Sequence, residues 1–254
     1  MKIEENLQKI REFLYQQYQK GRKVKFYKKK EKPQEYFKEV KIGVNLDEFK
    51  DIILQEETSL ELGGPERKSF STIYPLNDSS LLDDGNIVII GPEFKEISEK
   101  TVDFGIFLLI GTNFLSEQNF DQFRNINFIS NGIEGFMIRT IPRRFWCRIS
   151  NIVINKISFE FLANAILYLY NEKFGDLIKS IEIILMNSEI DTIDSFIEMT
   201  TPIRDEINLK WKEKVKEWKR RIDCDFGWNC NDCPYYDVCE DIKEVLEERE
   251  VLDK

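Results

Sequence analysis

The sequence SFEFLANAILYLYNEKFGDLIKSIEIILMN, residues 158–187, contains a helix signal followed directly by a strand signal. Ser158 is typical of a helix N-cap, and Gly175 is a residue type at which helices often end. We therefore predict a helix over Phe159–Phe174. The apolar run Lys179–Asn187, rich in isoleucine, then predicts a strand. Helices that alternate with strands in this way are typical of α/β and α+β domains.

Further elements upstream and downstream follow the same signals. Strands are expected where Ile, Val or Phe run between Gly, Pro, Asn or Asp, at Lys68–Pro75, Asn86–Ile90, Asp103–Gly111, Gly135–Ile141 and Phe145–Ile149. Apolar periodicity predicts helices over 1–20, around Leu46–Leu54, over Phe120–Ile129 and over 203–222. We expect an α/β (α+β) fold in which one mixed sheet is flanked by helices.

The chain is expected to divide into three segments. Residues 1–54 would hold an N-terminal helix and a basic strand within 22–32, residues 55–200 the central domain, and residues 201–254 a helical four-cysteine segment. The lysine-rich run 28–32 is either a solvated face or a docking surface for an acidic partner protein.

Composition excludes several classes of function. The formal net charge of −9 over 254 residues gives no general attraction to nucleic acid. No apolar run approaches the length that crosses a bilayer, and the N-terminus does not resemble a signal peptide, so we expect a cytoplasmic protein without a membrane contact. The chain has no histidine, which excludes Ser–His and Cys–His nucleophile pairs and histidine-ligated metals.

Four cysteines within sixteen residues form the strongest chemical signal. The segment reads Cys224-DFGWN-Cys230-ND-Cys233-PYYDV-Cys239. The central C-x2-C pair presents two thiolates to one metal site, and the two outer cysteines can close around it, which predicts a [4Fe–4S] cluster. An all-thiolate zinc site is the alternative, followed by disulfides or free thiols. The fifth cysteine, Cys147, is expected to be a buried core thiol.

Four stretches between residues 55 and 200 carry a family resemblance. They are SLELGGPERKSFSTIYPL (59–76), DGNIVIIGPEFKEI (84–97), IEGFMIRTIPRRFWCRIS (133–150) and ANAILYLYNEKFGDLIKSIEIILMNS (163–188). In order and spacing they resemble the central domain of acetyl-CoA synthase, the β subunit of the carbon monoxide dehydrogenase/acetyl-CoA synthase complex. Five short motifs in the same order carry this resemblance, and none of them is decisive alone.

The resemblance implies a role in one-carbon metabolism. The family's enzyme joins a corrinoid-bound methyl group, carbon monoxide and coenzyme A at a nickel–iron–sulfur centre on the domain after this one. That centre uses a Cys-Gly-Cys, which this sequence lacks. We therefore expect an accessory or redox iron–sulfur protein of CO/acetyl-CoA metabolism in an anaerobe, with a corrinoid protein, a ferredoxin-like protein or a complex subunit as partner. The alternatives are an acetyl-CoA synthase-class acyltransferase that acts with other subunits, and a non-enzymatic zinc-stapled module.

The resemblance also implies a coenzyme A site, because the family's central domain is arginine-rich. The matching residues here are Arg139, Arg143, Arg144 and Arg148, grouped around Trp146. Guanidinium groups bind phosphates through paired hydrogen bonds, and an indole can stack on adenine. The alternative is a solvated hairpin turn at residues 142–144. No catalytic residue is assigned.

Overall fold

The structure is a computed structural model that describes residues 2–44, 52–64, 66–113, 116–141, 144–207, 209 and 213. The chain forms two compact units, Met1–Thr200 and Thr201–Lys254. In the second unit, residues 201–207 are helical. The elements described below belong to the first unit. The predicted three-segment division of the chain stays a prediction.

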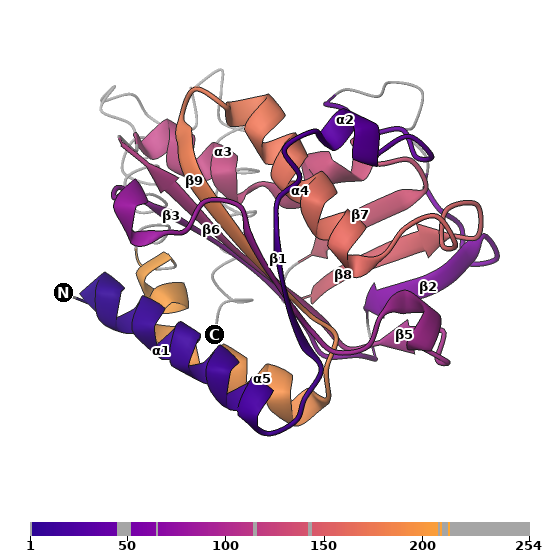
Figure 1. Ribbon diagram of the computed structural model, residues 1–254, viewed down its shortest axis with the longest axis horizontal. Coiled ribbons are helices and arrows are strands. Elements are labelled where there is room, and N and C mark those ends of the chain that lie inside the picture. The colour runs from indigo at the N-terminus through magenta and orange to yellow at the C-terminus, as the bar shows by residue number, and fades with distance from the viewer. Residues whose placement is uncertain are drawn as a thin grey trace, which may run out of the picture. The chain divides into compact units, whose positions relative to one another are not determined.

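The larger sheet has five strands. Its order is β1 (Val24–Lys28), β4 (Asn86–Ile90), β9 (Ile178–Met186), β6 (Phe104–Thr112) and β3 (Ser69–Leu76) (Figure 1). β4 is parallel to β9 and β3 is parallel to β6, whereas β1–β4 and β6–β9 are antiparallel. The sheet is therefore mixed, as predicted. The four strands predicted at 68–75, 86–90, 103–111 and 179–187 are confirmed within one residue at each end.

A second sheet of four strands accompanies the first, whereas the sequence predicted only one sheet. Its order is β5 (Thr101–Val102), β2 (Thr58–Gly63), β8 (Arg144–Ser150) and β7 (Phe136–Ile141). The predicted strands at 135–141 and 145–149 pair with each other, and the second of them, β8, also pairs with β2, which was not predicted. Pairing partners this far apart in the chain are chosen by tertiary packing, so a local pattern does not distinguish one sheet from two.

Helices cover both faces of the five-stranded sheet. They are α1 (Lys2–Gln19), α2 (Pro33–Tyr36), α3 (Glu117–Arg124), α4 (Phe159–Phe174) and α5 (Ile190–Met199), with 3-10 turns η2 (Ser79–Leu81), η3 (Phe94–Glu96) and η4 (Ile126–Asn131). The helix predicted over 159–174 is confirmed, and Ser158 caps it by accepting a hydrogen bond from the Phe161 amide at 3.1 Å. None of the described helices is both long and apolar enough to cross a membrane.

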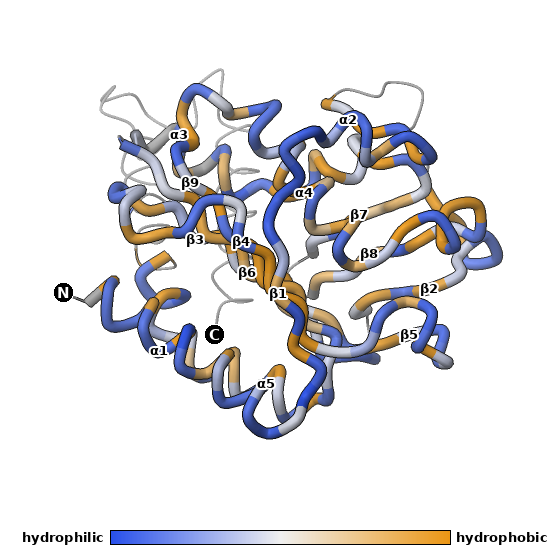
Figure 2. Tube along the Cα trace, in the orientation of Figure 1, coloured by the Kyte–Doolittle hydropathy of each residue, from blue (hydrophilic) through white to orange (hydrophobic). Residues whose placement is uncertain are grey.

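Alternation along β6 shows how the layers are built. Ile106 and Leu108 belong to the core that contains most of α4 and the inward side chains of the four-stranded sheet. Phe107, between them, points the other way and contacts Phe196 of α5 edge to face at 5.4 Å. Phe13 of α1 contacts the same Phe196 ring at 5.4 Å. α4 therefore packs on one face of the sheet and α1 with α5 on the other, around strands that are mostly hydrophobic (Figure 2).

Two helix predictions need correction. The helix expected over 120–129 is α3 followed by η4, because Asn125 leaves the helical conformation at ψ 92° and its side chain accepts a hydrogen bond from the Asn127 amide at 3.1 Å. The short helix expected around 46–54 falls mostly outside the described residues, and 52–54 are not helical. The helix predicted over 203–222 is helical through 207, and most of its remainder lies outside the described residues.

Candidate functional site

Trp146 and Arg148 lie on the outward face of the four-stranded sheet. Their neighbours Phe145, Cys147 and Ile149 alternate with them and are buried in the core. Because successive strand side chains point to opposite faces, Trp146 and Arg148 face away from that core. For Cys147 the structure confirms the predicted core thiol, and burial raises its pKa well above the usual value, so the thiol stays protonated and unreactive.

Arg139 joins these two residues from the neighbouring strand. It lies directly opposite Trp146 in the β7–β8 register, and its side chain is exposed. Arg144 occupies the first position of β8, with its side chain outside the described atoms, and Arg143 lies outside the described residues. The structure thus places Arg139, Trp146 and Arg148 on one face.

Arg148 is held by contacts within the protein. Its Nε donates to Glu61 Oε2 at 2.8 Å, and its Nη1 donates to the carbonyl of Ile53 at 3.0 Å. The guanidinium also lies 5.5 Å from the ring centre of Trp146. The side chains of Arg148 and Glu61 are only 20% and 15% exposed, so this ion pair is largely shielded from water. Arg148 therefore positions Trp146, and Arg139 is the exposed arginine beside it.

Two glycines make the Glu61–Arg148 contact possible and explain the ELGGP motif. Gly63 has φ +76°, and a Cβ there would lie 2.5 Å from the carbonyl oxygen of Phe145 on β8. Gly64 has φ +113°, and its Cβ would lie 2.8 Å from Glu61 Oε1. β2 can therefore end close against β8, with the Glu61 carboxylate over Gly64, only when both positions lack a side chain.

Trp146 also carries an unsatisfied donor. Its Nε1 is buried and has no hydrogen-bond partner among the described residues. An unpaired buried donor costs about 1–3 kcal/mol, so native proteins rarely leave one without a reason. Together with the exposed Arg139 opposite the indole, it marks this face as a candidate for binding a ligand with acceptor oxygens.

A second candidate is a cleft of about 710 Å³ at the carboxyl ends of β4 and β9. Gly91 follows β4 with φ +122°, and a Cβ there would lie 1.8 Å from Asn187 Oδ1. Asn187 follows β9, and its Nδ2 donates to the carbonyl of Pro92 at 2.6 Å. The IGP and MNS stretches therefore meet at the wall of the cleft. Asn187 was not predicted from the sequence, and the Gly91–Pro92 turn after a strand is the signal that could have pointed to this place.

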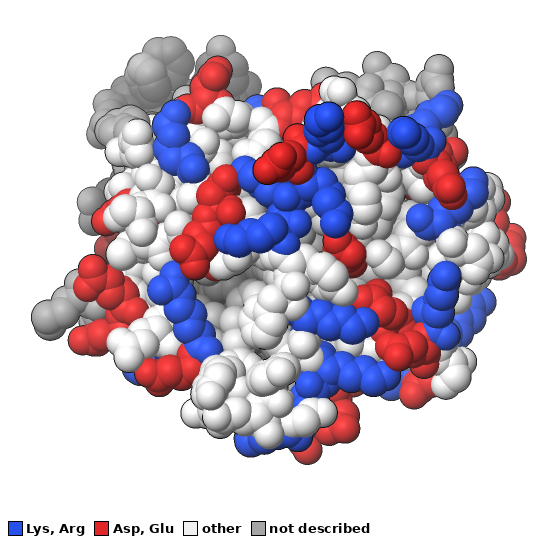
Figure 3. Space-filling view, in the orientation of Figure 1, with Lys and Arg blue, Asp and Glu red and all other residues white. Residues whose placement is uncertain are grey.

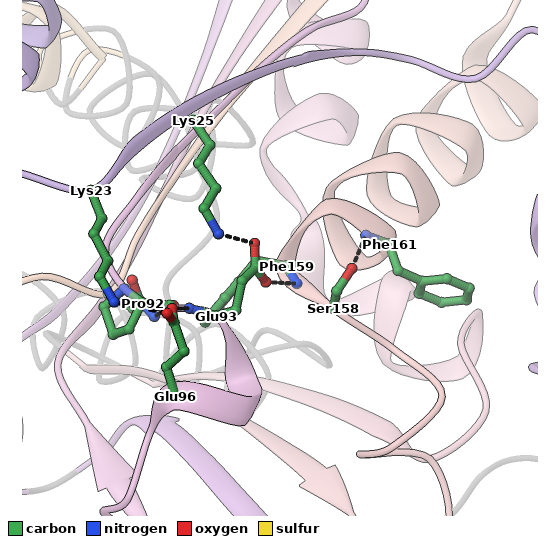
Figure 4. A network of polar contacts seen from close by, with 9 residues as sticks. Lys23, Lys25, Pro92, Glu93, Glu96, Ser158, Phe159 and Phe161 are labelled. Atoms are coloured by element: carbon green, nitrogen blue, oxygen red, sulfur yellow. Dashed lines mark hydrogen bonds and ion pairs between the residues drawn. The ribbon is translucent and has the colours of Figure 1, made fainter.

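A network around Glu93 supports one side of this cleft (Figure 4). Glu93 accepts from Lys25 Nζ at 3.1 Å and from the Phe159 amide, the first residue of α4, at 3.3 Å. Its own amide donates to Glu96 at 2.7 Å, and Glu96 also accepts from Lys23 at 2.8 Å. Burial alone lowers the pKa of Lys25, but the hydrogen bond and charge of Glu93 outweigh it and leave that pKa raised. The Glu93 carboxylate thus connects the loop after β4 to β1 and to the N-terminus of α4.

Replacing Glu93 with glutamine is expected to lower the free energy of unfolding by about 1–2 kcal/mol, because a charge is lost beside both a lysine and a helix N-terminus. Urea denaturation followed by circular dichroism measures the change. Glu35→Gln is the matched control, since Glu35 is 67% exposed and lies 3.8 Å from Lys32. Equal destabilisation by the two substitutions would contradict a special role for Glu93.

The basic run around β1 is largely neutralised by intramolecular ion pairs. Lys30 pairs with Glu160 at 2.7 Å, and Lys29 pairs with Asp84. Across the face that β1 crosses, basic and acidic side chains lie next to one another (Figure 3). These contacts favour the solvated face over the docking surface, because a charge already paired attracts a partner weakly. Lysines on an edge strand also discourage pairing with another sheet.

The predicted metal ligands Cys224, Cys230, Cys233 and Cys239 lie outside the described residues. The four-thiolate site therefore stays a prediction. Within the part of the chain that is described, no three His, Cys, Asp or Glu side chains are grouped so that they could hold a metal ion.

Comparison with known proteins agrees with the order of these motifs. Residues 42–192 match the family model for the CO dehydrogenase/acetyl-CoA synthase complex beta subunit. The chain is also 32% identical over 143 residues to the acetyl-CoA decarbonylase/synthase complex subunit beta of Methanopyrus kandleri. The aligned part is 55% of this chain and 30% of the M. kandleri protein. The family match contains β2 to β9 and the Arg139–Trp146–Arg148 face.

Proposed function

The chain belongs to the family of the CO dehydrogenase/acetyl-CoA synthase complex beta subunit, and on that basis we propose that it is an iron–sulfur accessory protein of CO and acetyl-CoA metabolism. The observation that carries the proposal is the family match over both sheets, followed by four clustered cysteines. Its role would be cytoplasmic redox transfer or partner binding. The partner would be a corrinoid protein, a ferredoxin-like protein or another subunit of such a complex.

Coenzyme A is the proposed small-molecule ligand of the Arg139–Trp146 face. The exposed guanidinium of Arg139 would bind a phosphate, and the indole opposite it would stack on the adenine. Arg148, already committed to Glu61, would hold the indole in position rather than contact the ligand. The unpaired Nε1 of Trp146 supports this proposal, because a ligand oxygen would supply its missing acceptor once the side chain adjusts.

In the coenzyme A proposal, Arg139→Gln is expected to weaken binding about tenfold, because a charge-assisted hydrogen bond contributes about 1.5–3 kcal/mol. Isothermal titration calorimetry measures the affinity. Lys28→Gln is the control, since Lys28 is an exposed cation on the other sheet. Wild-type protein that takes up no coenzyme A, or equal weakening by the two substitutions, would refute this site.

The four cysteines are proposed to hold a [4Fe–4S] cluster, and their all-sulfur donor set without histidine fits that group. When bound, the cluster would supply one-electron transfer or would staple the segment structurally. Cys147 would take no part, because it is buried in the core of the first unit.

Protein purified without air is expected to contain about four iron and four sulfide per chain. Cys230→Ser should remove most of the iron and the visible absorbance, whereas Cys147→Ser should keep both. A colourless protein with stoichiometric zinc would overturn the iron–sulfur proposal and favour the zinc-stapled module. Nickel together with acetyl-exchange activity would instead favour an acetyl-CoA synthase-class acyltransferase that acts with other subunits.

A further inference from the structure

We propose that the cleft at the carboxyl ends of β4 and β9 binds a small anion through a carboxylate or phosphate group. This inference does not depend on the coenzyme A proposal, which concerns the other sheet. Sixteen residues line the cleft, and the argument uses those that carry charge, cap α5 or shape its wall.

The position of the cleft favours ligand binding. β4 and β9 are parallel neighbours in the sheet. After β4 the chain enters η3, where Phe94 packs on Phe159 of α4 at 4.1 Å. After β9 it enters α5, where Phe196 packs on the other face of the sheet. When the segments after two adjacent parallel strands leave toward opposite faces, they open a crevice at the strand ends, which is the usual ligand site of open α/β sheets.

The N-terminus of α5 lies at the cleft. Glu189 occupies the N-cap position of this ten-residue helix and makes no side-chain cap hydrogen bond. Ser188 and Glu189 both line the cleft. An uncapped helix N-terminus has amide N–H groups without intrahelical acceptors and about half a positive charge, and both attract an anion.

Two arginines reach the same cleft from different segments. Arg22 precedes β1 and pairs with Glu189 at 3.1 Å, while Arg67 precedes β3 and pairs with Glu99. The arginine side chains are 30% and 34% exposed, whereas their carboxylate partners are 76% and 63% exposed. The cations therefore belong to the wall and the carboxylates to the rim. Surface pairs of this kind contribute only about 0–1 kcal/mol, so an incoming anion could exchange with either carboxylate at little cost.

The remaining carboxylates of the cleft are committed to the backbone. Glu96 accepts from the Glu93 amide at 2.7 Å, and Asp103 accepts from the Lys68 amide at 2.7 Å. Among the carboxylates of the cleft that belong to described residues, only Glu99 and Glu189 are thus placed to swing away. Once they do, the four basic side chains that line the cleft, Lys20, Arg22, Lys23 and Arg67, outnumber the carboxylates that stay.

The wall of the cleft also holds an unpaired polar atom. Asn187 is only 7% exposed, and its Oδ1 has no hydrogen-bond partner among the described residues. The same side chain fixes the loop after β4 through Pro92. This acceptor is buried against Gly91, so a ligand donor, such as the O–H of hydrogen phosphate, would reach it once the Asn187 side chain adjusts.

Titration of the full chain with inorganic phosphate tests the inference. Wild-type protein should bind phosphate, and Arg22→Gln and Arg67→Gln should each weaken binding about fivefold or more. Glu189→Gln should tighten it about threefold to tenfold, because the carboxylate that competes for Arg22 is removed. If Glu189 only ties α5 to the start of β1, this substitution will leave the affinity unchanged, and the inference fails.

Controls separate this cleft from the other sheet. Lys28→Gln should leave phosphate affinity unchanged, because Lys28 does not line the cleft. Arg139→Gln is expected to weaken coenzyme A binding, while the cleft of that variant should still bind phosphate. Loss of phosphate binding in Arg139→Gln but not in Arg22→Gln would move the anion site to the four-stranded sheet and overturn the inference. A parallel titration with acetate identifies the group that the cleft prefers. Tighter binding of acetate than of phosphate indicates a carboxylate ligand, and tighter binding of phosphate indicates a phosphate ligand. If neither anion binds, the site is refuted.

Discussion

Gly63→Ala is expected to lower the free energy of unfolding by about 3–5 kcal/mol or to prevent folding. Gly63 has φ +76°, where an L-residue costs about 1–2 kcal/mol. The new Cβ would also lie 2.5 Å from the carbonyl oxygen of Phe145 and 2.8 Å from Ser69 Cβ. A backbone carbonyl in a ladder cannot rotate away as a flexible side chain could, so β2 and β8 must separate. Denaturant unfolding followed by circular dichroism measures the loss.

Gly21→Ala is the matched control for this prediction. Gly21 has nearly the same conformation, at φ +72°, but its Cβ would meet nothing within 4 Å. It should therefore cost only the backbone term, about 1–2 kcal/mol. If the two alanine variants are equally stable, the close approach of β2 to β8 does not determine stability, and the explanation of the ELGGP motif is wrong.

Arg148→Gln is expected to destabilise the protein by about 2–4 kcal/mol. The substitution leaves the Glu61 carboxylate, 15% exposed, without its cation, and an uncompensated charge in a shielded site is costly. It also removes the donor to the Ile53 carbonyl and the cation above Trp146. Thermal and urea unfolding should both report the change.

Two comparisons make the Arg148 prediction specific. Arg139→Gln lies on the same face but is exposed, so it should change stability by less than about 0.5 kcal/mol. The double variant Glu61→Gln/Arg148→Gln should be less destabilised than the sum of the single variants, because each single variant leaves a lone charge and the double variant leaves none. Additive losses would show that the ion pair is not the source of the effect, and Arg148 would then be free to act as a ligand residue.

The local elements were largely readable from the sequence. β4 was predicted residue for residue, and α4 with its Ser158 cap was predicted as observed. The signals for these elements, which are the N-cap, the glycine that ends the helix and the apolar periodicity, act within a few residues. Where the prediction failed, a short-range polar contact intervened, as at Asn125. β2 and α5 were missed, since β2 is mixed in polarity and α5 follows β9 without a side-chain cap.

The sequence by itself determined the α/β character, the family resemblance and the cysteine cluster, because each depends on residue type and spacing along the chain. Only the tertiary structure decided which groups meet. The structure has two sheets where one was predicted, and it pairs Arg148 with Glu61, 87 positions apart in the chain. It also brought Asn187 to the loop after β4, 95 positions from Pro92. Such contacts depend on strand pairing and close backbone approach, and these are long-range outcomes of packing that local patterns do not encode.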